Sequence, residues 1–129
     1  MSIVTLAQAR RKAAVALIDP LFAGGNPAGK DLKKRLSGIP AKVGFNGLLQ
    51  TVASLNDEKP DSIEQQVLRL LIGMLEASPA LADVPRPAEP FFDWLAGLDG
   101  FVLARVEQES LACLAALKSE VEARSDSPA

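Results

Sequence analysis

The chain has 129 residues, a formal net charge of −2, no histidine and a single cysteine. The missing histidines exclude Ser-His and Cys-His nucleophile pairs and His-ligated metals, and one cysteine excludes an internal disulfide and a zinc knuckle. We therefore expect a protein that is not an enzyme and that holds no metal and no cofactor.

The remaining composition points to helices. Hydrophobic residues make up 48% of the chain and aromatic residues only 5%, a mixture rich in Leu and Ala that favours helix over sheet. No apolar run approaches the roughly 18 residues of a membrane span, and the amino terminus lacks a signal-peptide profile. We predict a cytoplasmic, all-α protein, a compact bundle of four main helices plus two short helices. One helical domain should cover residues 1–124, followed by a disordered tail over 125–129.

The modest net charge hides a strong asymmetry along the chain. Residues 1–42 carry eight basic and two acidic side chains, a formal charge of +6. Residues 43–129 carry six basic and fourteen acidic side chains, a formal charge of −8. A split of this size predicts one basic and one acidic surface.

The first third of the chain should form two helices. The first runs from about residue 2 or 5 to Ile18, where the Asp-Pro pair at 19–20 ends or kinks it. The composition of residues 23–29 indicates a loop. Residues 30–36 should form a short basic helix, which the Ser-Gly and Ile-Pro pairs at 37–40 interrupt.

The stretch AKVGFNGLLQTVASLNDEK, residues 41–59, carries two conflicting signals. Asn-Gly is a strong hairpin signal, yet the apolar residues around it recur at helical spacing. Two interpretations stay open. In one, the helix is continuous, and a close backbone neighbour compensates the roughly 1 kcal/mol that Gly47 costs against Ala. In the other, the helix starts late with Asn46 as its cap. A continuous helix places Lys42, Asn46 and Gln50 on one stripe.

The second half should contain a longer helix, a plug and a final helix. The Asp-Ser-Ile-Glu sequence at 61–64 resembles a capping box with Asp61 as its acidic cap, and the helix that follows ends near Ala77. Residues 78–90 contain four prolines and should form a surface connection. Pro90 then starts a short helix whose aromatic side chains cover the core. The final helix runs from about 101 to 123 and includes Cys113 as a small core residue.

Three segments of the sequence, in order, resemble one known family. KVGFNGLLQTVASLNDEK, residues 42–59, contains an asparagine-glycine-leucine-x-glutamine pattern. LAQARRKAAVAL, residues 6–17, precedes it, and FFDWLAGLDGFVLARVEQESLACLAALKSEVEA, residues 91–123, follows. Together they resemble the small helical subunit of type III-B CRISPR effector complexes, the Cmr small-subunit family. The chain departs from that family at Ala13 or Val15, where an aromatic residue is common, and in its acidic final helix.

The resemblance implies a non-catalytic, RNA-binding subunit of a ribonucleoprotein in antiviral defence. Its partners would be the backbone and large subunits of the complex and further copies of itself, stacked beside guide and target RNA. Contacts to RNA would go to the backbone rather than to bases. The candidate RNA-binding residues are Arg10, Arg11, Lys33, Lys34, Arg35, Lys42, Asn46 and Gln50. We expect the first helix to pack against the 41–59 stretch, and the acidic half of one copy to meet the basic half of the next.

Two other classes of function stay open on the sequence. One is an unrelated helical adaptor that binds a basic protein through its acidic half. The other is an enzyme that acts through carboxylates such as Glu107 and Glu109. On a helix these two residues lie about 200° apart and do not converge on one substrate.

Overall fold

The computed structural model describes residues 5–23, 29–84 and 90–125, and every regular element in these ranges is helical. In chain order the elements are α1 (Leu6–Phe22), α2 (Gly29–Asn56), α3 (Ile63–Ala77), the 3-10 helix η1 (Pro79–Leu81), α4 (Phe91–Ala96) and α5 (Gly100–Ser125). The all-α class is confirmed, with four long helices and two short ones. Ser125 belongs to α5, whereas residues 126–129 of the predicted tail lie outside the described residues, as do 24–28 of the predicted loop.

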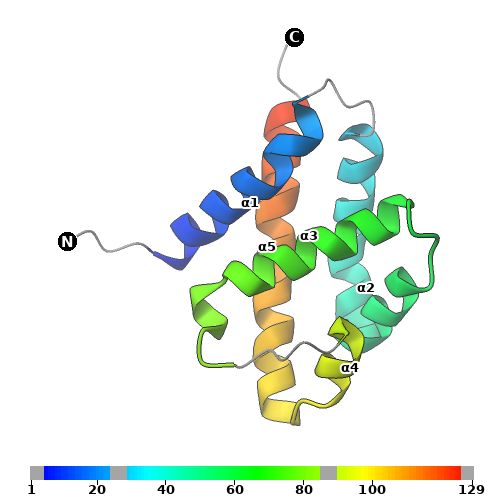
Figure 1. Cartoon of the computed structure of the whole chain (residues 1–129), viewed down its shortest axis with the longest axis vertical. Helices are drawn as coiled ribbons and strands as arrows, with labels where there is room; N and C mark the ends of the chain where they lie inside the picture. Colours follow the sequence, from blue (N-terminus) through cyan, green and yellow to red (C-terminus); the bar gives the residue numbers. More distant parts are fainter. Residues whose placement is uncertain (1–4, 24–28, 85–89, 126–129) are drawn as a thin grey trace.

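Helix α5 is the axis of the bundle and packs against α1, α2 and α3 (Figure 1). Its buried side chains recur at helical spacing, and Val106, Cys113, Leu117 and Val121 are fully buried. Helix α3 crosses this layer and packs against α1 and α2 as well, while the short α4 covers α2. Helix α1 packs chiefly against α5 and α3, so the expectation that it packs against the 41–59 stretch is wrong.

Helix α1 begins at a capping box and continues past its proline. The Thr5 hydroxyl accepts the Gln8 backbone N–H, and the Gln8 side chain accepts the Thr5 backbone N–H. The T-x-x-Q pattern of residues 5–8 is the sequence signal for this start. The predicted end at Ile18 is wrong, because α1 runs through Pro20 to Phe22. Packing of Leu21 and Phe22 on the core offsets the roughly 3 kcal/mol that an interior proline costs.

The first part of α2 also continues through positions where the sequence predicts breaks. Residues 37–40 do not interrupt it, and Pro40 lies inside the helix. A single apolar face runs through the supposed interruption, formed by the buried Leu32, Leu36, Ile39 and Val43. The Ser37 hydroxyl returns a hydrogen bond to the Lys33 carbonyl at 2.9 Å instead of ending the helix. The tertiary burial of this face therefore outweighs the local Gly and Pro signals.

The remaining elements follow the predictions closely, with corrections at their starts. Helix α3 ends at Ala77 as expected, but its cap is Ser62 rather than Asp61, because the Ser62 hydroxyl accepts the Gln65 N–H at 3.2 Å. Pro90 occupies the cap position of α4 rather than its first turn. Phe91 and Trp94 are buried and cover the core, as predicted.

Candidate nucleic-acid interface

The exposed side of α2 gathers three of the eight candidate RNA-binding residues. Arg35, Lys42 and Asn46 follow each other at spacings of seven and four residues, which places them within about 40° of one another around the helix axis. All three are exposed. Lys34, also exposed, adjoins Arg35 and shares with it a shallow hollow between α2 and α3, lined also by Asp31, Ile63 and Glu64. We call Lys34, Arg35, Lys42 and Asn46 the α2 face.

Two other candidates on α2 do not belong to this face. Lys33 is nine residues before Lys42, about half a turn away around the axis, and is half-buried. Gln50 lies beyond a break in the helix, because Gly47 adopts φ 81° and ψ 163°. The predicted stripe of Lys42, Asn46 and Gln50 requires a continuous helix and is therefore wrong in its last member.

The break at Gly47 resolves the conflict in the 41–59 stretch. Neither interpretation is correct as stated: the helix does not pass unbroken through Gly47, and Asn46 is not the cap of a new helix. Residues other than glycine rarely adopt the backbone conformation of Gly47, which explains why glycine is required here. After the break, the helical path resumes with Leu48, and the last part of α2 turns away from the first (Figure 1).

A carboxylate from α5 supplies the missing cap. Glu107 Oε2 accepts the Leu48 backbone N–H at 3.0 Å, and so partners an amide at the start of the second part of α2. Within the same second part, the buried Thr51 hydroxyl donates to the Gly47 carbonyl at 2.9 Å. Leu48, Val52 and Leu55 then bury the second part against the core. The side chain of Phe45, also placed on this apolar stripe by the sequence, lies outside the described residues.

Arg10 is engaged inside the protein. Its Nη2 donates to Glu109 Oε1 at 2.6 Å and its Nε to Glu109 Oε2 at 3.0 Å, a two-point contact between α1 and α5. The Arg10 side chain is 23% exposed and that of Glu109 only 5%. Glu109 Oε2 also accepts the Ser78 hydroxyl at 2.8 Å. Arg10 therefore neutralises a buried carboxylate, a role that the sequence analysis missed.

The contacts around Glu109 shift the pKa values of three ionisable groups, those of Glu109, Arg10 and Cys113. Burial pushes the pKa of Glu109 upward, but the hydrogen bonds from Arg10 and Ser78 and the Arg10 charge outweigh it, and the net pKa is lowered. The hydrogen bond to Glu109 raises the pKa of Arg10. Burial, followed by the Glu109 charge, raises the pKa of Cys113 to about 12, so this thiol stays protonated and unreactive.

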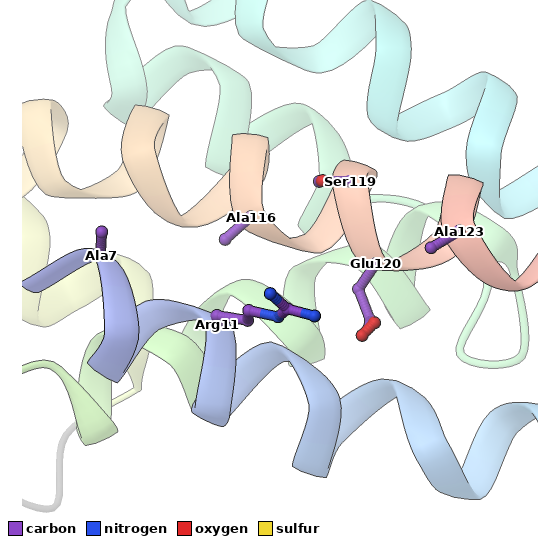
Figure 2. Close-up of a pocket in the computed structure, with 6 residues that line it drawn as sticks. All are labelled: Ala7, Arg11, Ala116, Ser119, Glu120 and Ala123. Atoms are coloured by element: carbon purple, nitrogen blue, oxygen red, sulfur yellow. The ribbon is translucent and has the colours of Figure 1, made fainter.

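Arg11 occupies a different place from the α2 face. Figure 2 shows it reaching from α1 into a groove of about 360 Å³ between α1 and α5, beside Glu120. The remaining walls are the small side chains Ala7, Ala116, Ser119 and Ala123. Arg11 is therefore not part of one surface with Lys42.

The two charge halves of the sequence meet within one molecule. Ion pairs between described residues join residues of 1–42 to residues of 43–129, among them Arg10 with Glu109, Arg35 with Glu64, and Arg124 with Asp19. The predicted separation into one basic and one acidic surface is therefore only partial. In the described part of the chain, Lys34 and Lys42 pair with no carboxylate.

The carboxylates considered for catalysis point to different partners. Glu107 reaches α2 and Glu109 reaches α1, as their angular separation on a helix predicts. Over the described ranges, no group of three or more His, Cys, Asp or Glu side chains is arranged to hold a metal ion. None of the helices in these ranges has the length and apolar character needed to span a membrane.

The comparisons with known proteins give one match. A family model described as CRISPR-associated protein (Cas_Cmr5) matches residues 6–124, which is most of the chain. No curated protein and no solved structure matches significantly.

Proposed function

The chain belongs to the CRISPR-associated Cmr5 family, and from this we propose that it is a non-catalytic subunit that stacks beside guide and target RNA in a type III effector complex. Family membership makes it a component of such a complex. The stacking, the RNA contacts and the absence of catalysis are the proposal.

The observation that carries the RNA role is the α2 face. Arg35, Lys42 and Asn46 lie along one side of a rigid helix, with Lys34 next to them. Lys34 and Lys42 have no carboxylate partner among the described residues, so their charges are available to an outside anion. Cations spaced along a helix contact successive phosphates without reading bases, which suits a complex whose specificity comes from base pairing with a guide.

The other predicted RNA residues take lesser places in this proposal. Arg10 contributes by joining α1 to α5, because its guanidinium is already bound to Glu109. Lys33, about half a turn from Lys42, and Gln50, beyond the break at Gly47, lie outside the α2 face. Arg11 lies in the groove between α1 and α5, and we place it at a contact with another copy.

Two features of α5 support a head-to-tail contact between copies. Phe101, at its amino-terminal end, is 77% exposed, whereas the groove between α1 and α5 lies near its carboxyl-terminal end. Patches at opposite ends of one helix favour a heterologous contact, which repeats along a line instead of closing a symmetric pair. Asp99 beside Phe101 and Arg11 in the groove also have opposite charges.

The test is Lys42→Ala, alone and with Lys34→Ala, in the reconstituted complex, with Lys118→Ala on α5 as a control for the single variant. Target RNA affinity should fall similarly for every guide sequence, and the log–log salt slope should flatten by about 0.7–0.9 for each lost phosphate contact. The control should leave both quantities unchanged, because Lys118 lies on α5, away from the α2 face, and pairs there with Glu122.

Unchanged affinity and slope in a complex that still contains the double variant would refute the RNA role of the α2 face. The basic residues would then serve protein contacts. Metal-dependent RNA cleavage that disappears on changing one carboxylate of this chain would refute the non-catalytic assignment.

A further inference from the structure

The break at Gly47 is held from outside its own helix. Between the first and second parts of α2 the backbone leaves the helical conformation at Gly47, and amides at a helix start need partners from elsewhere. Glu107 supplies one by accepting the Leu48 N–H at 3.0 Å across a separation of 59 residues. The nearest non-local atom to a side chain built on Gly47 would also be Glu107 Oε2, at 3.9 Å.

Glu107 is fixed by a rigid support. It lies on the central helix α5, next to Val106 and three residues before Ser110, both fully buried. The backbone of Glu107 is therefore anchored in the core, and its hydrogen bond ties the start of the second part of α2 to the central helix. The first part, which carries Lys42 and Asn46, ends directly at this fixed point.

We propose that Glu107 is a positioning residue for the α2 face. By accepting the Leu48 N–H it fixes the break at Gly47, and thereby sets the place of Asn46 and Lys42 relative to Gln50. The inference rests on the proposed RNA role of the α2 face and adds to it a residue that carries the wrong charge to contact RNA.

Because Glu107 is negatively charged, the direction of the change in RNA affinity distinguishes a positioning role from a simple charge effect. An acidic side chain near an RNA-binding surface repels phosphate, so its removal should strengthen binding if charge were its only effect. Loss of the cap has the opposite consequence, because the α2 face loses its fixed geometry. The two explanations therefore predict changes in opposite directions for the same substitution.

The experiment uses the reconstituted complex with Glu107→Ala, Glu107→Gln and, as a control of equal charge change, Glu122→Ala. We expect Glu107→Ala to weaken target RNA binding about 3- to 10-fold without flattening the salt slope, because no phosphate contact is removed. Glu107→Gln keeps an oxygen that accepts the Leu48 N–H, and should restore affinity to within about twofold of the original protein. Glu122→Ala, near the far end of α5, should leave the affinity unchanged or slightly improved.

Hydrogen exchange of the free chain gives a second measurement that does not depend on assembly. Glu107→Ala should accelerate exchange at the Leu48 amide and its neighbours up to Thr51, while α5 amides remain protected. A uniform acceleration over the whole chain would overturn the proposal, because Glu107 would then contribute only to global stability.

Failure of this inference is separable from failure of the proposed function. Unchanged or tighter RNA binding by Glu107→Ala, in a complex where Lys42→Ala still weakens binding, would overturn the positioning role alone. Normal binding by the Lys42→Ala complex would instead refute the RNA role of the α2 face.

Discussion

Helices α1 and α2 are both attached to α5 through a carboxylate, and the two attachments differ in kind. Glu109, 5% exposed, has a complete set of partners: two nitrogens of Arg10 and the Ser78 hydroxyl, with the Cys113 thiol at 3.5 Å. Glu107, only two residues away, is half-buried and is held by a single backbone N–H. A buried charge is tolerable only when it is fully partnered, whereas a half-exposed carboxylate keeps water for its remaining lone pairs.

The difference separates a cation that is neutralised inside the protein from cations that stay exposed. On the α1 side, a cation from the basic part of the sequence is used inside the protein, as Arg10 is by Glu109. On the α2 side, the carboxylate binds backbone, and the neighbouring cations Lys34 and Lys42 remain exposed. The basic charge of the first 42 residues is thus partly neutralised inside the protein and partly exposed, which the net charge alone does not distinguish.

The largest effect should come from breaking the α1 attachment. Glu109→Ala removes the acceptor of both Arg10 and Ser78 and leaves polar groups unpartnered at a buried position. We expect the free energy of unfolding to fall by about 3 kcal/mol, at the lower end for a broken buried pair because Arg10 keeps some contact with water. Denaturant unfolding followed by circular dichroism measures this loss.

Acid titration provides the control for this prediction. The folded-state pKa of Glu109 is lowered from its ordinary 4.5, so its contribution is present above that value and is lost as the pH falls through the folded pKa. Glu109→Gln, which cannot ionise, should therefore show a weaker fall in stability below pH 4.5 than the original protein. Equal pH dependence in the two proteins would show that the pair with Arg10 stabilises nothing.

On the α2 side, the strongest single change is Gly47→Ala. The φ of 81° at Gly47 is strained for any residue with a side chain, and we expect a loss of about 2 kcal/mol. The matched control is Gly44→Ala, three residues earlier, where nothing lies within 4 Å of an added Cβ. There the same change should stabilise the helix by about 0.5–1 kcal/mol. Equal effects at the two glycines would contradict the break.

Much of this architecture was predictable from the sequence because it depends on periodicity. The end of α3 and the extent of α5 follow from apolar spacing and were predicted within two residues. Even the errors in α1 and the first part of α2 have a common cause. The prolines at 20 and 40 predict breaks locally, but the apolar faces continue past them and keep both helices intact there.

The site was less predictable because its main contacts join distant positions. Arg10 and Glu109 are 99 residues apart, and Leu48 and Glu107 are 59 apart. No spacing rule within one helix reveals such pairs, so a free cation and a neutralised one look alike in the sequence. The Asn-Gly pair did mark the break, but the partner that stabilises it lies on α5.

The smallest effect should come from an ion pair at the surface. Arg35 Nε lies 3.0 Å from Glu64 Oε1, but the Arg35 side chain is 53% exposed, in contrast to the enclosed Arg10–Glu109 pair. Solvent screens such a contact and side-chain entropy opposes it, so Arg35→Ala should cost only about 0.5 kcal/mol. The difference from the original protein should vanish in about 1 M salt, where the Debye length is near 3 Å. A loss above about 2 kcal/mol, or one insensitive to salt, would mean that α2 and α3 depend on this pair as α1 and α5 depend on Glu109. Because Arg35 also belongs to the α2 face, a small stability effect is the condition under which its substitution reports cleanly on RNA binding.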